Sequence, residues 1–297
     1  MQSKLTDINP MKISVALPTY NGEKFLNSLL DSIAVQTYPI NELVICDDAS
    51  KDKTLDLVRD FSRSNCNFEI KLFTNKHNLG LIKNVSKAIK LCTGHFILLA
   101  DQDDIWEISK VEKILNEYKY SRCEYLISNM LIIDSFGNEH DTTWVDYREK
   151  VFGLSRSYHM NGCSVGATKR FLNSCLPIPP GKGHDAWFAY CARKLNTRKY
   201  LHEPLMKYRV HLGGLSSKNY FNSIQQSSDR QMSAKARQEL KIYNYHGKSI
   251  FLRKIRTIIV RKSLLKLFSV KLAMRVYFIL VRIKWNNSHY TKDLGLR

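Results

Sequence analysis

Three carboxylates fall within four residues, at Asp101, Asp103 and Asp104, directly after the apolar run of residues 95–100. Such a run predicts a buried strand, and acids that follow it lie at the carboxyl edge of a sheet, where open α/β sheets bind ligands. Acids crowded at that edge repel one another and need a counter-charge, most simply a divalent cation. The stretch therefore predicts a site for a metal ion and a nucleoside diphosphate.

The Asp-x-Asp spacing points Asp101 and Asp103 in the same direction if the segment is extended. Mg²⁺ or Mn²⁺ is held by a few carboxylates together with diphosphate oxygens and water. The alternative is that these acids cap the following helix, and Asp104 is the one expected to play that part.

A second acid pair, Asp47 and Asp48, ends the strand predicted over residues 42–46. A carboxylate here could accept a hydrogen bond from the ring N–H of uracil or thymine. It could equally cap the helix that follows Ser50, and the residues alone do not separate the two roles.

Two motifs lie further along the chain. Asp185 opens a predicted helix directly after His184, where an acid serves either as a helix cap or as a general base that deprotonates an acceptor hydroxyl. Arg209 and His211 share one face of an extended segment. Both could meet a diphosphate, and His211 is also a candidate metal ligand.

The hydrophobic pattern predicts alternating strands and helices in the first hundred residues, which is typical of a parallel, doubly wound sheet. The predicted strands are residues 12–17, 42–46, 69–73 and 95–100, and the predicted helices are residues 23–36, 52–61 and 82–91. The second part is less regular. It is predicted to hold a helix at 111–118, strands at 125–133 and 199–210, a turn at 136–138 and a loop at 161–166.

Most of the net charge of +19 lies in the tail, where residues 241–297 hold 14 Lys and Arg and one acid. Lys271, Arg275 and Arg282 are spaced to share one helical face, as in a basic amphipathic helix on an anionic membrane surface. An accessory helical domain is the alternative.

Seven scattered cysteines without a Cys-x-x-Cys pair argue against a disulfide framework or a zinc site, and fit a reducing cytosol.

Four motifs in order give the chain a family resemblance: Val15–Gly22, Ile45–Ser50, Asn78–Gly80 with Asn84, and Asp101–Asp104. Together they resemble a family 2 (GT-A fold) glycosyltransferase, closely over residues 12–110 and onward to about residue 215. The resemblance implies an α/β, Rossmann-like, mostly parallel sheet flanked by helices. It also implies a catalytic domain over residues 1–215. Beyond the resemblance, the polar composition of residues 216–240 predicts a linker or mobile loop, and the charge pattern of residues 241–297 predicts a basic amphipathic helical membrane-association tail.

The resemblance also assigns roles to individual residues. The catalytic base would be Asp185. The metal site would hold Asp103, with Asp101 and His211. The donor nucleotide would meet Pro18, Thr19, Tyr20, Asp47, Asp48, Asn78, Asp101 and Arg209. The acceptor side would hold Gly162, Cys163, His184 and Trp187. His184 stands where the family usually has an acid before the base.

The implied function is an inverting, Mn²⁺- or Mg²⁺-dependent transfer of a sugar from a dTDP- or UDP-linked donor to a saccharide or lipid-linked oligosaccharide. The Asp-Gln-Asp-Asp-Ile-Trp and His-Asp-x-Trp forms resemble rhamnosyltransferases of bacterial surface-polysaccharide assembly, which makes rhamnose a candidate sugar. The implied location is cytoplasmic, peripheral on the inner face of the plasma membrane.

Two other functions are open. One is a nucleotide-sugar-binding or nucleotidyltransferase-like protein of the same fold. Pyrophosphorylases have a glycine-rich basic loop after the first strand, whereas this chain has Pro18–Gly22. The other is a non-catalytic module that binds membrane or nucleic acid. The apolar content of the tail favours lipid, so no nucleic-acid partner is expected.

Overall fold

The computed structural model describes residues 11–64, 67–153, 159–211 and 214. The chain divides into two units, residues 1–236 and 237–297, and every described residue belongs to the first. The predicted linker and basic tail therefore lie outside the described residues. Among the helices that are described, none has the length and apolar character needed to span a bilayer.

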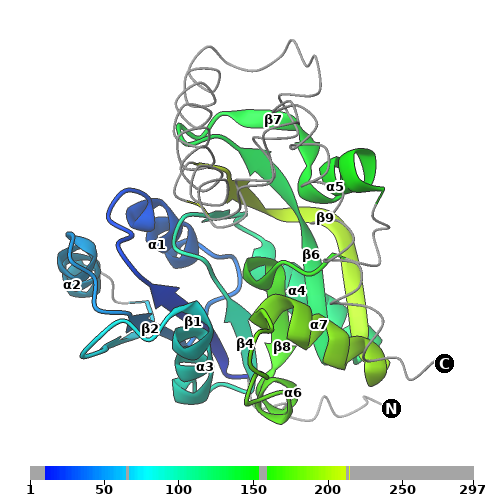
Figure 1. The fold of residues 1–297 in the computed structure, drawn as a ribbon, viewed down its shortest axis with the longest axis horizontal. Helices are drawn as coiled ribbons and strands as arrows, with labels where there is room; N and C mark the ends of the chain where they lie inside the picture. The colour runs from blue at the N-terminus through cyan, green and yellow to red at the C-terminus, as the bar shows by residue number, and fades with distance from the viewer. Residues whose placement is uncertain (1–10, 65–66, 154–158, 212–213, 215–297) are drawn as a thin grey trace, which may run out of the picture. The chain divides into compact units, whose positions relative to one another are not determined.

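Four parallel strands form the first half of the sheet, in the spatial order β3-β2-β1-β4 (Figure 1). Their side chains are almost wholly buried in β1, β2 and β4, as expected for strands covered on both faces. The four strands confirm the prediction for this region. They are β1 (Ile13–Thr19), β2 (Glu42–Asp47), β3 (Glu69–Thr74) and β4 (Phe96–Leu99).

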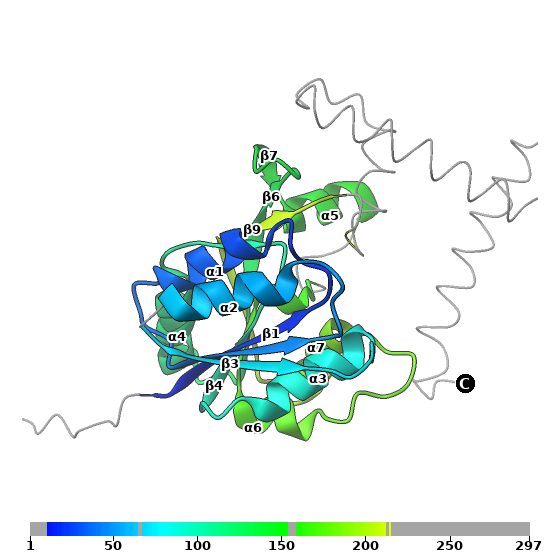
Figure 2. The ribbon, with the colours of Figure 1, turned by 90° about the vertical axis from the view of Figure 1, so that its left-hand side faces the viewer.

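Helices cover both faces of this half of the sheet. The connecting helices are α1 (Leu26–Ala34), α2 (Thr54–Ser64) and α3 (Leu81–Leu91), each within a few residues of its predicted range. Figure 2 shows α1 and α2 on one face, and α3 with α6 (Lys169–Ser174) on the other. Each crossover returns the chain to the same end of the sheet, so the carboxyl ends of β1, β2 and β4 lie at one edge.

The second half makes the sheet mixed. β8 (Val165–Thr168) lies antiparallel to both β4 and β6 (Tyr125–Ile133), and β9 (Arg198–Arg209) runs parallel to β6. β5 (Ile105–Trp106) and β7 (Glu139–Thr143) pair antiparallel with β9 and β6. The remaining helices are α4 (Lys110–Ser121), α5 (Trp144–Phe152) and α7 (His184–Lys194).

Two local predictions are wrong. The predicted loop at 161–166 contains a 3₁₀ turn, Gly162–Ser164, and the start of β8, because Val165 and Gly166 pair between β4 and β6. Asp104 does not cap the next helix. The N-cap of α4 is Ser109, and Asp104 instead precedes β5.

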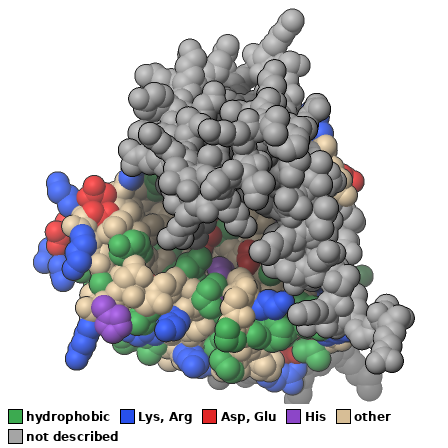
Figure 3. Space-filling model, viewed as in Figure 1, with side chains coloured by type: hydrophobic (Ala, Val, Ile, Leu, Met, Phe, Trp, Pro, Cys, Tyr) green, Lys and Arg blue, Asp and Glu red, His purple; other side chains and the backbone are tan. Residues whose placement is uncertain are grey.

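The described surface is uneven in charge. On the face seen in Figure 3, Lys and Arg side chains lie mainly towards the rim with some acidic side chains beside them, and further acidic side chains and a histidine are visible near its middle. The six cysteines within the described residues are all free thiols.

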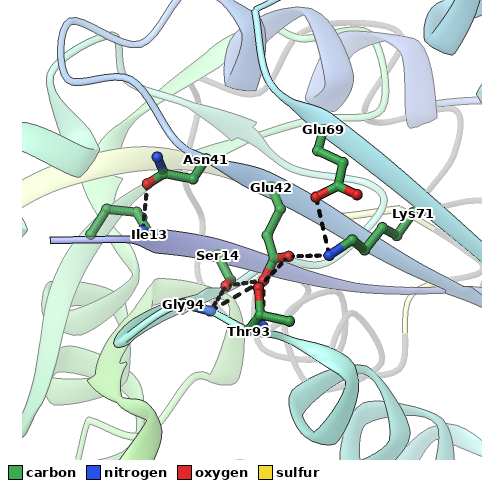
Figure 4. Close-up of polar contacts among 8 residues, drawn as sticks. All are labelled: Ile13, Ser14, Asn41, Glu42, Glu69, Lys71, Thr93 and Gly94. Atoms are coloured by element: carbon green, nitrogen blue, oxygen red, sulfur yellow. Dashed lines mark hydrogen bonds and ion pairs between the residues drawn. The ribbon is translucent and has the colours of Figure 1, made fainter. Parts of the chain in front are cut away.

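A buried carboxylate ties together the amino ends of the first strands (Figure 4). Glu42 is fully buried and accepts hydrogen bonds from Ser14 Oγ at 2.5 Å, Lys71 Nζ at 2.7 Å and Thr93 Oγ1 at 2.8 Å. The backbone N–H groups of Thr93 and Gly94 also donate to it. Burial by itself raises the pKa of Glu42, but these hydrogen bonds outweigh burial and lower it to about 2.

The substitution Glu42→Gln keeps the size of this side chain and removes its charge. We expect it to lower the free energy of unfolding by about 3 kcal/mol at neutral pH, because the five donors stabilise a carboxylate. The folded pKa of about 2 lies below the ordinary 4.5, so this stability is present above pH 4.5 and is lost as pH falls towards 2. Urea unfolding at neutral pH and at about pH 3 measures both effects.

Glu69→Gln is the matched control. Glu69 pairs with the same Lys71 at 3.1 Å, but its side chain is 58% exposed. We expect a change below about 0.5 kcal/mol, because exposed ion pairs contribute little. Equal losses in the two variants would show that the buried network does not hold the strands.

Candidate active site

The acids predicted to act together form one loop at the carboxyl edge of the sheet. This acid loop, residues 101–104, leaves β4 and leads into β5. The carboxylate of Asp103 lies 2.8 Å from His211 Nε2, and the buried Asp104 accepts a hydrogen bond from the backbone N–H of Arg209 at 3.1 Å. The end of β9 therefore closes over the acid loop, so the structure brings the predicted metal ligands Asp101, Asp103 and His211 to one place.

Like charges are crowded in the acid loop. Burial, and after it the negative charges of Asp103 and Asp185, raise the pKa of Asp101 to about 7. The pKa of Asp104 is well above its ordinary value for the same reasons, burial first and then its neighbours. Asp104 Oδ2 is buried and has no hydrogen-bond partner. The carboxylates of the loop therefore repel one another and are not fully compensated by the groups around them.

These side chains fit a hard divalent cation. Ligand atoms of Asp101, Asp104 and Cys163 all lie within 4.8 Å of one another. Carboxylate oxygens are the ligands that Mg²⁺ and Mn²⁺ prefer. The thiol of Cys163 does not suit such an ion, because burial raises its pKa well above the ordinary value and keeps it protonated. The carboxylates of the acid loop therefore fit such a cation and the thiol does not; the pair predicted to face the cation is Asp101 and Asp103.

Asp185 lies within electrostatic range of the acid loop although it is far away in sequence. It occupies the first turn of α7, and its Oδ1 accepts a hydrogen bond from the N–H of Ala186 at 2.7 Å. Its charge raises the pKa values of Asp101 and Tyr125. The predicted base thus lies near enough to one predicted metal ligand, Asp101, for their charges to interact.

Two cations lie under the acid loop. Lys110 is fully buried; its Nζ donates to the carbonyl of Cys163 at 2.9 Å and lies 4.0 Å from the ring centre of Trp106. Burial lowers the pKa of Lys110 to about 8. Lys110 was not among the residues predicted for the site, although its spacing from Ile114 places it on the buried face of α4.

Arg209 is the second cation, and it holds backbone atoms. Its Nε donates to the carbonyl of Asp103 at 2.9 Å, and its Nη1 donates to the carbonyl of Asp134 at 3.2 Å. The guanidinium lies 4.7 Å from the ring centre of Phe25. These contacts position the acid loop, whereas the sequence analysis assigned Arg209 to the donor diphosphate.

The predicted nucleotide residues lie at the ends of β1 and β2. Asp47 accepts from Thr19 Oγ1 at 3.0 Å and from the N–H of Ser50 at 2.9 Å, which closes the turn before α2. Pro18 and Thr19 belong to β1. The ring of Tyr20, just after β1, is exposed, at 46% for the residue.

Asp48 organises the loop after β3. Its Oδ1 accepts from Asn75 Nδ2 at 2.8 Å and from the N–H of Leu79 at 2.7 Å, and its Oδ2 accepts from the N–H of Gly80 at 2.9 Å. Asn78 Oδ1 accepts from the same Gly80 N–H at 2.9 Å. Asp48 therefore holds the neighbouring loop in place around the predicted nucleotide side.

The predicted acceptor-side residues are mostly engaged in packing. His184 is buried, which lowers its pKa, and its ring lies so close to Gly162 that a side chain at residue 162 would collide with it. Cys163 is buried and offers its carbonyl to Lys110. Trp187 Nε1 donates to the carbonyl of Cys175 at 2.7 Å. Of this group, the structure places His184 beside Asp185 and directs Trp187 towards the end of α6.

The raised pKa of Asp101 predicts a pH-dependent affinity for the cation. Below pH 7 the carboxyl carries a proton that competes with the metal, so Mn²⁺ affinity should fall about tenfold between about pH 8 and pH 6. The same pKa, raised above 3.8, means that the metal-free protein loses stability as pH rises from 3.8 through 7. Titration calorimetry with Mn²⁺ measures the first effect, and thermal unfolding measures the second.

Asp101→Asn should bind Mn²⁺ more weakly and with little dependence on pH. Asp60→Asn is the matched control, because Asp60 has a side chain that is 69% exposed on α2. A wild-type affinity that does not change over this pH range would contradict the assignment of the cation to Asp101.

Comparison with known proteins supplies the last observation on this site. A family model described as "Glycosyl transferase family 2" matches residues 14–168, just over half of the chain. The matched range holds the acid loop and the ends of β1 and β2, and it ends before Asp185.

Two curated relatives illustrate the similarity. The chain is 34% identical over 123 residues to the Escherichia coli "UDP-Glc:alpha-D-GlcNAc-diphosphoundecaprenol beta-1,3-glucosyltransferase WfgD", a match that covers 41% of this chain and 47% of that protein. It is 25% identical over 237 residues to an uncharacterized glycosyltransferase of Nostoc, covering 76% and 72%. The chain thus spans about half the length of the first relative.

The fold is shared with solved structures. Staphylococcus aureus TarS 1–349 in complex with UDP-GlcNAc superposes with a TM-score of 0.57 at 22% identity, covering 73% of this chain and 65% of that one. Mannosyltransferase PcManGT of Pyrobaculum calidifontis, in complex with GDP-Man and Mn²⁺, gives 0.55 at 17% identity, covering 73% and 61%. The chain therefore has the GT-A fold, with a mixed sheet flanked by helices.

Proposed function

The chain belongs to glycosyl transferase family 2, and from that membership we propose that it moves a hexose from a nucleoside-diphosphate donor to a hydroxyl of a saccharide or lipid-linked acceptor. The observation that carries this proposal is that Asp185 lies near enough to the acid loop for its charge to raise the pKa of Asp101. A transfer with inversion requires a base that deprotonates the acceptor hydroxyl, and a cation at the acid loop would offset the charge of the leaving diphosphate.

The proposed mechanism assigns a task to each group. Asp101 and Asp103 would hold Mn²⁺ or Mg²⁺, which when bound offsets the charge of the departing nucleoside diphosphate. Asp185 takes the proton of the acceptor hydroxyl. At the same time the hydroxyl oxygen attacks the anomeric carbon on the face opposite the leaving group. The bond to the diphosphate breaks as the new glycosidic bond forms, so the configuration inverts.

A UDP-linked donor is the first choice. Asp48 accepts two hydrogen bonds on Oδ1 and one on Oδ2, so one lone-pair position of Oδ2 remains for the ring N–H of uracil or thymine. The name of the Escherichia coli relative includes UDP-Glc, and TarS was solved with UDP-GlcNAc. We therefore propose glucose or N-acetylglucosamine ahead of rhamnose.

A donor screen tests this function. Purified protein is incubated with UDP-Glc, UDP-GlcNAc, dTDP-rhamnose or GDP-Man and with Mn²⁺ or Mg²⁺, and release of nucleoside diphosphate is measured with and without lipid extract as acceptor. We expect acceptor-dependent release from a UDP-linked sugar, lost on removal of the metal by EDTA. Nucleotide binding without release from any donor would contradict a transferase and favour a binding protein of the same fold.

The substitution Asp185→Asn tests the base. We expect it to slow transfer by about 10²- to 10⁴-fold, the contribution of general-base catalysis, while UDP binding stays within about twofold. Single-turnover assays and calorimetry measure the two quantities. Asp60→Asn should transfer at the wild-type rate. Wild-type turnover in Asp185→Asn would assign the base elsewhere.

We also propose that residues 1–215 form the catalytic domain and that the basic tail, residues 241–297, holds the protein at the cytoplasmic face of the membrane. Its charge of +13 and its apolar blocks support this proposal. Lys271, Arg275 and Arg282 changed together to Glu should abolish flotation with vesicles that contain anionic lipid. Flotation unchanged by these substitutions would favour an accessory domain.

A further inference from the structure

We propose that Gln102 is a positioning residue that couples the nucleobase side of the site to the acid loop. The identities of the two ligands rest on the proposed function, whereas the link itself is visible in the structure. The Nε2 of Gln102 donates to the carbonyl of Tyr20 at 3.0 Å, and the N–H of Tyr20 donates to Gln102 Oε1 at 2.9 Å. One side-chain amide thus pairs with both backbone groups of a single residue.

This contact lies where two neighbouring strands separate. The β1–β4 ladder ends with Ala16 beside Leu99, followed by the N–H of Ala100 donating to Ala16 at 3.1 Å. Beyond that point the β1–β4 ladder no longer joins the segment after β1 to the acid loop. The two hydrogen bonds of the Gln102 amide take the place of backbone pairing and connect these two segments.

Gly22 leaves the space for this amide. A Cβ at residue 22 would lie 2.5 Å from Gln102 Oε1. The backbone of Gly22 is itself fixed, because its N–H donates to Thr54 Oγ1 at 2.7 Å and its carbonyl accepts from the N–H of Leu26 at the start of α1. A larger residue at position 22 would therefore displace the amide of Gln102, whereas the backbone of Gly22, which is not in the left-handed region, does not itself call for glycine.

The position of Gln102 lets this contact connect the expected cation side of the site with the expected nucleobase side. It lies between Asp101 and Asp103, the pair assigned to the cation, and its partner Tyr20 presents an exposed ring where the nucleobase is expected. A shift of the acid loop on cation binding is passed to the Tyr20 peptide through two hydrogen bonds. Because these bonds are partly exposed to water, we expect a coupling of about fivefold, equivalent to about 1 kcal/mol.

Uridine and Mn²⁺ are the probes that test this coupling. Uridine carries no diphosphate to ligate the cation, so any effect of Mn²⁺ on uridine affinity must pass largely through the protein. Uridine titrations followed by NMR, with and without saturating Mn²⁺, give the two dissociation constants. We expect Mn²⁺ to tighten uridine binding to the wild-type chain about fivefold.

Gln102→Met keeps a side chain of similar length and removes both hydrogen bonds. We expect each probe alone to bind within about twofold of the wild type and the coupling factor to fall to about one. Gly22→Ala should have the same effect, because its methyl group displaces the amide. A purely structural role would weaken binding of each probe without changing the ratio.

Gln36→Met is the matched control. Gln36 Nε2 donates to the carbonyls of Ser32 and Glu107, both at 2.9 Å, and its Oε1 accepts from the N–H of Val111 at 3.0 Å, so this variant also loses its amide hydrogen bonds, three in all. We expect a lower melting temperature and a wild-type coupling factor. Full coupling in Gln102→Met, or no coupling in the wild type, would overturn the proposal. If the wild type binds neither uridine nor UDP, both the proposed donor and the coupling are wrong. If it binds them but shows no coupling, only the coupling is wrong.

Discussion

Repulsion among carboxylates at one edge of the sheet is the constraint on which the rest of the site depends. Burial and mutual repulsion raise the pKa values of Asp101 and Asp104, and one oxygen of Asp104 has no partner. Buried charges of one sign persist only where the surrounding structure holds them. Here Lys110 lies beneath them among sulfur and aromatic groups, and Arg209 binds the loop backbone. The fold thus holds an arrangement that a bound cation would relieve.

The opposite edge of the same sheet shows the contrast. Glu42 is equally buried, but five donors surround it and its pKa falls to about 2. A carboxylate with all its hydrogen bonds made stabilises the amino ends of the strands, whereas carboxylates without them are available for ligands. The amino edge of the sheet therefore contributes stability, and the carboxyl edge holds the groups that are available for ligands. This division explains why the short connections after β1, β2 and β4 all contribute to the site.

The hydrogen bonds between loops show how a parallel sheet holds its binding edge. Asp47 and Asp48 bind backbone N–H groups of the segments before α2 and before α3, and Gln102 joins the segments after β1 and β4. Because strand ladders stop at this edge, side chains must fix the loops that follow. The same short motifs consequently contain both the residues that bind a ligand and the residues that position those ligand-binding residues.

Much of the fold was determined by the sequence alone. Apolar runs and helical spacing located the first four parallel strands and three helices, because burial on both faces leaves a strong local pattern. They also located β6, β9, α4 and α7. The acid motifs were placed at strand ends for the same reason. Tertiary structure decided the rest. The strands β5, β7 and β8 are short and depend on their neighbours for pairing, so no local period marks them.

The contacts of single side chains were also decided by the tertiary structure. Arg209 faces backbone carbonyls, Asp104 binds β9 instead of capping a helix, and Lys110 and Gln102 join elements distant in sequence. A sequence pattern shows which face a residue occupies, but not which atom across the core it meets. That depends on how β9 and α7 return to the acid loop, which is a property of the whole fold.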